Sequence, residues 1–413
     1  MSSEILFFII LGIVIASFLF EQILDYLNYK KFNDPIPNEL HDVYDKEEYE
    51  KSQKYKITTY RFGLLSSWIS FSGIVLFLIF DGFALVNQWA YDITSQPILV
   101  ALIFFGILGL ASDILSTPFT YYSTFVIEEK FGFNKTTKKT FWLDKLKGWL
   151  VGAILGSVLI GLIIWFFEKF PDTFWIYAWI LISVFSIFMN LFYTKIFVPL
   201  FNKQAPLEKG QLREKIEQYA KKVGFQINKI FVIDGSKRST KANAYFSGFG
   251  SQKQITLYDT LVNDLKDEEI VAVLAHEVGH YKHRHIIYNL SISILSTGFT
   301  LWLLSLLIGS PLIYEALGVI NPGFHIGLIA FGLLYTPIST LTSFLMNILS
   351  RKFEYQADDY AANTYASKHL LNALKKLSKK SLSNLTPHPL YVKVHYSHPS
   401  LLQRTQNLKK YSL

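Results

Sequence analysis

Seven stretches of the chain are apolar and long enough to cross the roughly 30 Å hydrocarbon core of a lipid bilayer. The predicted spans are Ile5 to Leu24, Phe62 to Phe80, Pro97 to Phe119, Trp149 to Phe167, Phe174 to Thr194, Ile286 to Leu312 and Ile326 to Ser350. A single acid, Asp113, interrupts the third span. The first has no basic residue before it and no small-residue cleavage site after it, so we expect a retained span rather than a signal peptide.

Basic residues between the spans predict the orientation of the chain. The loops after spans one and three carry seven and six Lys or Arg residues, whereas the loops after spans two, four and six carry only Lys169. By the positive-inside rule the basic loops are cytoplasmic. We therefore expect the amino terminus outside, and the segment Lys195 to His285 and the carboxyl terminus in the cytoplasm. The membrane would be a bacterial inner membrane or the endoplasmic reticulum.

Composition agrees with a membrane protein. Hydrophobic residues make up 51% of the 413 positions, aromatic residues 16% and charged residues 17%. The net charge of +8 fits the anionic cytoplasmic face of a membrane, and the basic residues form no groove-reading module, so we expect no nucleic-acid partner. Because the chain has no cysteine, any metal ion must be held by His, Asp or Glu.

The long cytoplasmic segment shows the periodicity of a folded domain. Gly210 to Gly224 has helical spacing of apolar residues, Asn228 to Ile233 resembles a strand, and Asn243 to Gly250 and Lys253 to Val262 are two further strand-like runs. Asp267 to Ile286 has a helical pattern that opens on three acids. The fold class predicted is a predominantly α-helical integral membrane protein with a cytoplasmic domain that contains a small β-sheet.

These features divide the chain into four parts. Residues 1–200 hold spans one to five with their loops, and residues 201–285 form a cytoplasmic segment. Spans six and seven occupy residues 286–350. Residues 351–413 form a carboxy-terminal segment. No particular oligomeric state is indicated.

The stretch VLAHEVGHYKHRH contains the pattern His-Glu-x-x-His. Residues four apart share one face of a helix, so His276 and His280 can bind one zinc ion and leave Glu277 beside a water molecule. Zinc lowers the pKa of such a water, and a carboxylate can carry its proton to the leaving amine. Gly279 is a poor helix former and predicts close approach of another element. The metzincin extension would need Gly at His283 and His at Ile286, so that class is excluded.

A catalytic zinc site requires a third protein ligand. We interpret His283 and His285 as interfacial bases at the end of span six. The segment SRKFEYQADDYA, after span seven, offers Glu354 and Asp358 four residues apart. Glu354 can then bind the zinc while Asp358 accepts a hydrogen bond from the other nitrogen of a liganding histidine.

Four motifs, HEVGH, FEYQAD, NAYF and the carboxy-terminal HYSHPSLLQR, together with seven spans, resemble the type I CAAX prenyl protease family of membrane zinc metalloproteases. The resemblance implies seven helices around a water-filled chamber that the catalytic domain closes at one end. It implies one zinc ion per chain, held by His276, His280 and Glu354, with Glu277 as general base. It further implies that Asn243, His398 and Arg404 contact the substrate or its transition state.

The expected activity is hydrolysis of peptide bonds near the carboxyl end of proteins or peptides, including prenylated ones. An edge strand from Asn243 to Ser247 could pair with an extended peptide, and His398 or Arg404 could neutralise the oxyanion.

Three alternatives are open. A site-2-type protease has the same motif inside an apolar span, which the basic residues from Lys282 to His285 contradict. HtpX-like quality-control proteases share the pattern but have fewer spans. A transporter or scaffold with a structural zinc would not require Glu277.

Overall fold

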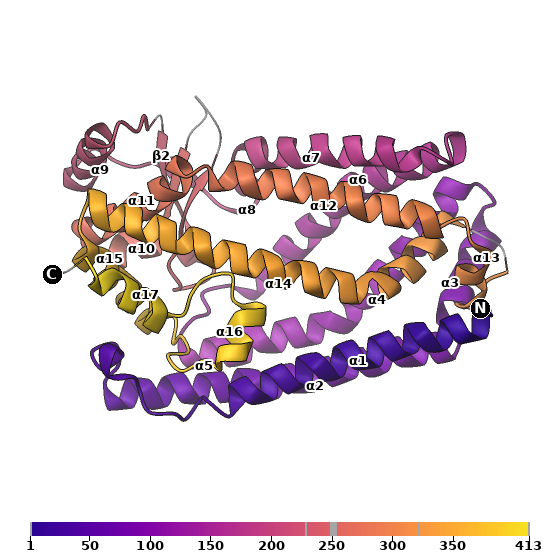
Figure 1. Ribbon diagram of the computed structural model, residues 1–413, viewed down its shortest axis with the longest axis horizontal. Coiled ribbons are helices and arrows are strands. Elements are labelled where there is room, and N and C mark those ends of the chain that lie inside the picture. The colour runs from indigo at the N-terminus through magenta and orange to yellow at the C-terminus, as the bar shows by residue number, and fades with distance from the viewer. Residues whose placement is uncertain (1, 228, 248–253, 321–322, 412–413) are drawn as a thin grey trace.

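A computed structural model describes the chain except for residues 1, 228, 248–253, 321–322 and 412–413. Within these residues seven helices are long and apolar enough to cross a membrane, and they coincide with the seven predicted spans. They are α1 (Ser3–Tyr29), α2 (Lys46–Ile79), α4 (Pro97–Tyr122), α6 (Lys138–Lys169), α7 (Phe174–Ile196), α12 (His285–Leu307) and α14 (Phe324–Thr364) (Figure 1).

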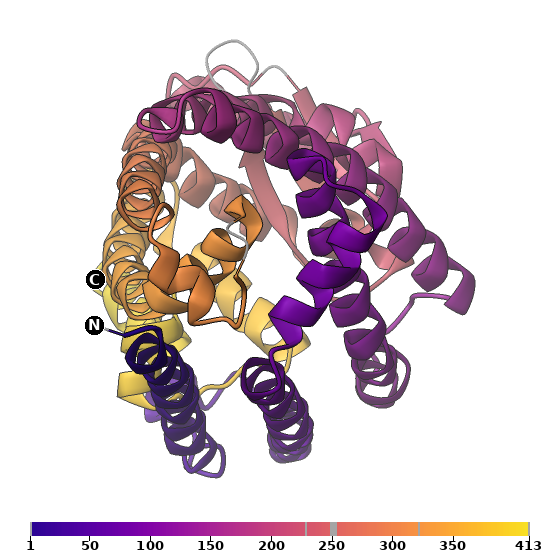
Figure 2. The same cartoon turned by 90° about the vertical axis from the view of Figure 1, so that its right-hand side faces the viewer.

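The helices of the spans stand side by side as a ring when the molecule is seen end-on (Figure 2). Only 6–17% of the most apolar window of each helix is buried within the molecule. Helices packed into a solid bundle would bury a continuous apolar stripe. The low burial therefore agrees with helices that enclose an interior space.

Several helices extend beyond the apolar runs. The most consequential is α14, which continues from the seventh span to Thr364 and carries Glu354 and Asp358 on its last turns. At the end opposite the HEVGH motif, α3 (Gly82–Ile93) and α13 (Pro311–Glu315) pack on α1, α4 and α14 around a buried apolar cluster. Shorter helices connect the rest: η1 (Asn38–Leu40), the π-helix η2 (Ser123–Glu128), α5 (Glu129–Phe131), α8 (Val198–Phe201) and η3 (Gly235–Lys237).

The predicted sheet has four strands in the order β1-β2-β4-β3. They are β1 (Gln204–Pro206), β2 (Lys229–Ile233), β3 (Ala244–Ser247) and β4 (Gln254–Tyr258). Strand β2 is parallel to β4, and the other two pairs are antiparallel. Strand β1 was not predicted, and the expected strand positions at Asn228, 248–250 and Lys253 lie outside the described residues. Because β3 is at the edge of this sheet, one of its sides has no partner strand among the described residues.

The final expected strand ends earlier than the sequence pattern indicates. The chain leaves β4 after Tyr258 and forms α10 (Asp259–Asp264), so Thr260 to Val262 are helical. Asp259 causes the change, since its Oδ1 accepts the backbone N–H groups of Ser236 at 2.9 Å and Thr260 at 2.8 Å. An acid that binds backbone N–H groups favours a helix start over a continuing strand.

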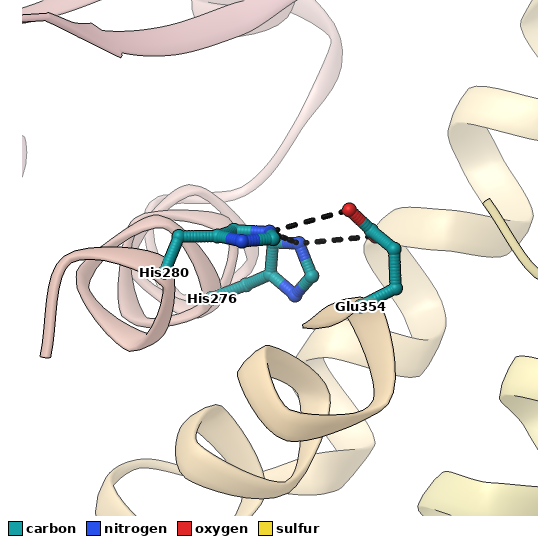
Figure 3. Close-up of side chains that lie close together, drawn as sticks. All are labelled: His276, His280 and Glu354. Atoms are coloured by element: carbon teal, nitrogen blue, oxygen red, sulfur yellow. Dashed lines mark hydrogen bonds and ion pairs between the residues drawn. The ribbon is translucent and has the colours of Figure 1, made fainter. Parts of the chain in front are cut away.

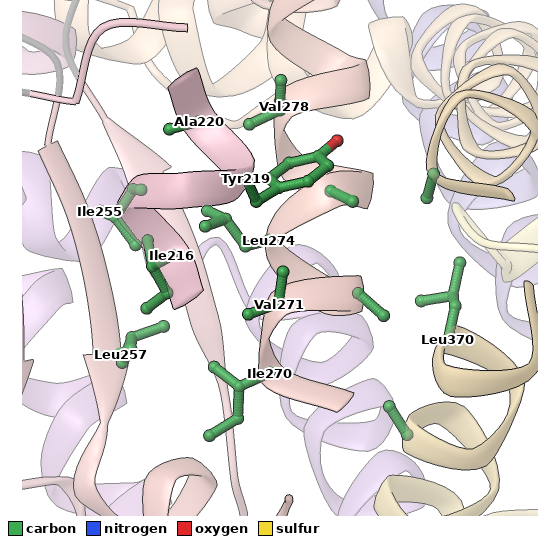
Figure 4. Packing of buried hydrophobic residues seen from close by; sticks show 14 of the residues in the cluster. Ile216, Tyr219, Ala220, Ile255, Leu257, Ile270, Val271, Leu274, Val278 and Leu370 are labelled. Atoms are coloured by element: carbon green, nitrogen blue, oxygen red, sulfur yellow. The ribbon is translucent and has the colours of Figure 1, made fainter. Parts of the chain in front are cut away.

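The cytoplasmic domain has its own apolar core between the sheet and its helices (Figure 4). Ile216 and Tyr219 of α9 (Gln211–Lys222), together with Leu257 of β4, pack against α11 (Asp267–Lys282). From α11 itself, Ile270, Val271, Leu274 and Val278 are buried in this core. The carboxy-terminal helices α15 (Ser367–Lys380), α16 (Pro389–His395) and α17 (Leu401–Lys409) complete the domain. This core holds α11, and with it the HEVGH motif, rigidly against α14.

Candidate metal centre

The HEVGH motif lies on α11, whose first turn carries Asp267, Glu268 and Glu269. Acids in the first turn stabilise a helix through its dipole. The apolar residues of α11 face the domain core, which turns His276 and His280 toward α14. A Cβ atom on Gly279 would lie 2.9 Å from the Ala357 Cα, so the predicted close approach is present and the approaching element is α14.

His276, His280 and Glu354 converge where α11 crosses α14 (Figure 3). The Nε2 atoms of the two histidines are 3.1 Å apart. Glu354 places one carboxylate oxygen 3.5 Å from His276 Nε2 and the other 3.3 Å from His280 Nε2. One ligand atom from each residue lies within 4.8 Å of the other two. Two imidazole nitrogens and one carboxylate oxygen form the donor set of many catalytic zinc sites.

The surroundings of this cluster favour a positive charge at its centre. Glu354 Oε2 is buried and has no hydrogen-bond partner among the described residues. Burial would lower the pKa of His276, but its contacts with the carboxylates of Asp358 and Glu354 outweigh burial and raise the pKa to about 9. Arg404 Nη1 at 3.6 Å and His276 Nε2 at 3.5 Å are charged or polar neighbours of Glu354 Oε2, and an oxygen that accepts no hydrogen bond has lone pairs free to bind a metal cation. The residues present therefore fit a bound metal cation.

Asp358 and Arg404 support His276 from the protein interior. Asp358 Oδ1 lies 2.9 Å from His276 Nδ1, the geometry that the spacing of Glu354 and Asp358 predicts. Arg404 of α17 donates two hydrogen bonds to the same carboxylate, from Nε at 2.9 Å and from Nη2 at 2.5 Å. If His276 Nδ1 donates to Asp358, its Nε2 lone pair is directed at the cluster.

His285 supports the second histidine, and the sequence interpretation of this residue was wrong. His285 is 2% exposed rather than interfacial, and its Nδ1 lies 2.9 Å from His280 Nδ1. Its Nε2 lies 2.9 Å from Gln356 Oε1 on α14, and its ring stacks on Phe353 at a centroid distance of 4.0 Å.

A break in the helix explains why His285 was missed. The sequence pattern predicted one helix from Asp267 to Ile286, but α11 ends at Lys282 and α12 begins at His285. Arg284 between them has a left-handed φ of 59°. This turn redirects the chain and points His285 back at His280. The remaining signal in the sequence was the presence of two further histidines, His283 and His285, directly after the motif.

Glu277 lies beside the cluster and faces the edge of the sheet. It shares a small cavity with Ala244 and Tyr245 of β3. Burial raises the pKa of its carboxyl group, and a carboxylate with a raised pKa is a stronger proton acceptor. Asn243 immediately precedes this strand and is exposed, and its Oδ1 accepts the N–H of Ala244 at 2.9 Å.

His398 approaches the cluster from the open side. Its Nε2 lies 3.3 Å from Glu354 Oε1, and its side chain is 61% exposed. Arg404, in contrast, is buried behind the ligands, with Nη1 3.6 Å from Glu354 Oε2. The turn at Pro399 and the capped start of α17 at Ser400 bring His398 to one oxygen of Glu354 and Arg404 to the other.

Two family descriptions match the chain almost end to end. Residues 25–203 match "CAAX prenyl protease N-terminal, five membrane helices", and residues 206–412 match "Peptidase family M48". The chain belongs to peptidase family M48. As a member of this family it is a membrane metalloprotease, and its clustered His276, His280 and Glu354 are the fitting place for the metal.

Relatives in the M48 family are similar over nearly their whole length. CAAX prenyl protease 1 of Saccharomyces cerevisiae is 36% identical, and the alignment covers 96% of this chain and 93% of the relative. The Arabidopsis thaliana homolog is 37% identical, with 96% and 95% covered. The human homolog is 33% identical, with 91% and 88% covered.

The crystal structure of S. mikatae Ste24p has the same fold. It is 36% identical to this chain and superposes with a TM-score of 0.93 over 98% of this chain and 99% of that one. The full-length likeness confirms the predicted fold class and the membrane endopeptidase activity. The HtpX-like alternative and the non-enzymatic alternative are not favoured by this likeness.

Proposed function

We propose that this protein is a zinc endopeptidase that cleaves peptide bonds near the carboxyl end of proteins or peptides, including prenylated ones. The observation that carries the proposal is the convergence of His276, His280 and Glu354 beside Glu277. The names of the CAAX prenyl protease 1 relatives support the substrate class. A bound zinc ion, one per chain, would lower the pKa of water and polarise the scissile carbonyl.

The roles of the residues follow from their positions. Glu277 accepts the proton of the attacking water and passes it to the leaving amine, and its raised pKa matches this task. Asp358 fixes the tautomer of His276. If His280 holds a metal through Nε2, its Nδ1–H would donate to His285 Nδ1, and His285 Nε2–H would donate to Gln356 Oε1. Both liganding rings are thus held in orientation by hydrogen bonds to neighbouring side chains.

We propose that the substrate lies extended along β3. This strand is at the edge of the sheet and borders the cavity of Glu277, so a peptide paired with it passes close to the general base. Asn243, at the start of the strand, would bind the peptide backbone. His398 is exposed next to Glu354 and could donate to the oxyanion, whereas Arg404 would act by holding Asp358 and adding positive charge.

The proposed orientation places the amino terminus outside and the catalytic domain in the cytoplasm, since the basic loops lie at the catalytic end. The membrane is the endoplasmic reticulum in a eukaryotic source or the inner membrane in a bacterial one.

Mass spectrometry of the products of one peptide in prenylated and unprenylated form tests this function. We expect a single cut near the carboxyl end, abolished by a chelator and restored by zinc. Cleavage that survives chelation would contradict the metal-dependent mechanism, and equal rates for both forms would contradict a role for the lipid.

A further inference from the structure

A cavity of about 370 Å³ lies between α1, α2 and the segment from Asn384 to Tyr396. It is lined by the rings of several tyrosines and by a few polar side chains, and it contains none of the proposed metal ligands. A mixed aromatic and polar lining is typical of sites that bind a specific ligand.

Lys56 of α2 is a buried cation in the wall of this cavity. It is 8% exposed, and its Nζ donates one long hydrogen bond, of 3.4 Å, to Asn384 Oδ1. Asn384 is itself fixed, because the same oxygen accepts the N–H of Thr386 at 3.0 Å. In the described part of the chain no carboxylate lies within 4.0 Å of the Lys56 ammonium. A buried ammonium group without a counter-ion is unfavourable, so the wall favours an anionic ligand.

Asp25 is the carboxylate that lines the same cavity, and it lies more than 4.0 Å from the Lys56 ammonium. It is near enough to His395 and Tyr391 of α16 for both to influence its charge, and His395 Nε2 lies 3.2 Å from Glu21 Oε2. The acid thus belongs to a cluster on α1 and α16. The positive charge of Lys56 at the other wall remains available to a ligand.

Tyr396, in one wall of the cavity, is connected to the helix that carries Glu354. The carbonyl of Tyr396 accepts a hydrogen bond of 2.5 Å from Arg351, which precedes Glu354 by three residues, or roughly 4.5 Å along α14. Two residues after Tyr396, His398 contacts Glu354.

Tyr55, also in the wall of the cavity, is connected to the segment just before β3, the strand proposed to pair with the substrate. Tyr55, next to Lys56, donates a hydrogen bond of 2.5 Å to Glu128, and Glu128 also accepts one of 2.9 Å from Lys241. Lys241 lies two residues before Asn243. Hydrogen-bonded side chains therefore connect the residues of the cavity to α14 on one side and to the segment before β3 on the other.

We propose that Lys56 binds the terminal carboxylate of the peptide substrate, so that cleavage occurs at a fixed distance from the carboxyl end. This inference rests on the proposed endopeptidase function. It adds the substrate group, the terminal carboxylate, whose binding would fix the position of the cleaved bond. A carboxylate is the anion that every substrate of this kind carries at its end. A charged hydrogen bond to it corresponds to a preference of about 10- to 100-fold over an uncharged end.

Two peptides that differ only in a free carboxylate or a carboxamide at the end provide the test, with full-length protein in liposomes. For the wild type we expect kcat/KM to favour the acid by about 10- to 100-fold. In Lys56→Met this ratio should fall toward one, and in Lys56→Arg it should be largely kept. Lys54→Met, an exposed lysine on the same helix, is the matched control and should keep the wild-type ratio.

Thermal stability separates binding from a structural role. Because Met removes a buried charge that has no carboxylate within 4.0 Å, Lys56→Met should melt at the wild-type temperature or above it. A wild-type ratio near one, or an unchanged ratio in Lys56→Met, would overturn the inference while the endopeptidase function stands. A Lys56-dependent thermal shift with phosphatidic acid vesicles but no effect on the ratio would assign the site to a lipid phosphate and also overturn it. If the wild type cleaves neither peptide, the proposed function fails and this inference with it.

Discussion

Gly279 of α11 and Ala357 of α14 touch backbone to backbone, and this contact sets the distance between the histidines and Glu354. A Cβ on Gly279 would lie 2.9 Å from Ala357 Cα and 3.0 Å from its carbonyl oxygen. Neither atom can move without moving the helix. The two helices that carry the proposed ligands can therefore approach this closely only because Gly279 has no side chain.

Gly279→Ala should push α11 away from α14. We expect a loss of about 1–3 kcal/mol in stability from overpacking and a zinc affinity lower by about tenfold or more. Thermal melting and competitive zinc titration measure the two effects. Gly156→Ala in α6, where a Cβ would meet nothing within 4 Å, is the matched control and should change neither. Unchanged zinc affinity in Gly279→Ala would show that the contact does not set the ligand geometry.

Glu277→Gln should bind close to one zinc ion per chain and lose hydrolysis. The amide keeps the size of the side chain but cannot accept a proton, and removal of a general base lowers turnover by about 10²- to 10⁴-fold. Metal analysis and peptide turnover on one sample check this. Turnover near the wild-type level would remove Glu277 from the mechanism.

His285→Phe should weaken zinc binding about 10- to 100-fold, because the ring still stacks on Phe353 but no longer accepts a hydrogen bond from His280. Zinc titration of the purified protein measures the loss. His283→Phe, two residues away and exposed, is the control and should bind zinc normally. Equal affinities in the two variants would mean that His285 merely fills space.

His398→Ala should lower turnover by about a hundredfold with zinc content and thermal midpoint unchanged, since the exposed ring is proposed to stabilise the oxyanion. Turnover, metal content and melting are measured on the same preparation. If turnover instead follows stability, His398 only holds the turn before α17.

A cysteine introduced into this cysteine-free chain tests the orientation. Ser95→Cys, in the turn between α3 and α4, should react with an impermeant thiol reagent from the outer or lumenal side. Lys209→Cys, between β1 and α9, should react only from the cytoplasm. The reverse labelling pattern would invert the proposed topology.

The sequence by itself determined the seven spans, the HEVGH helix and the candidate ligands. These features rest on local rules: an apolar run must be long enough to cross a bilayer, and residues four apart share a helix face. Glu354 and Asp358 could be paired for the same reason, since both lie on one helix. Their contact with His276 follows once α14, which carries both acids, is assumed to pack against α11.

Only the tertiary structure decided how the helices meet and what surrounds the ligands. The inward turn of His285 depends on the left-handed residue Arg284, and the local pattern predicted an unbroken helix there. Arg404 was proposed to contact the substrate, but folding buries it against Asp358, 46 residues away in sequence. The burial of the Lys56 charge depends on the packing of α2 against Asn384, 328 residues later. Such contacts arise from packing between distant segments, and no periodicity in the chain encodes them.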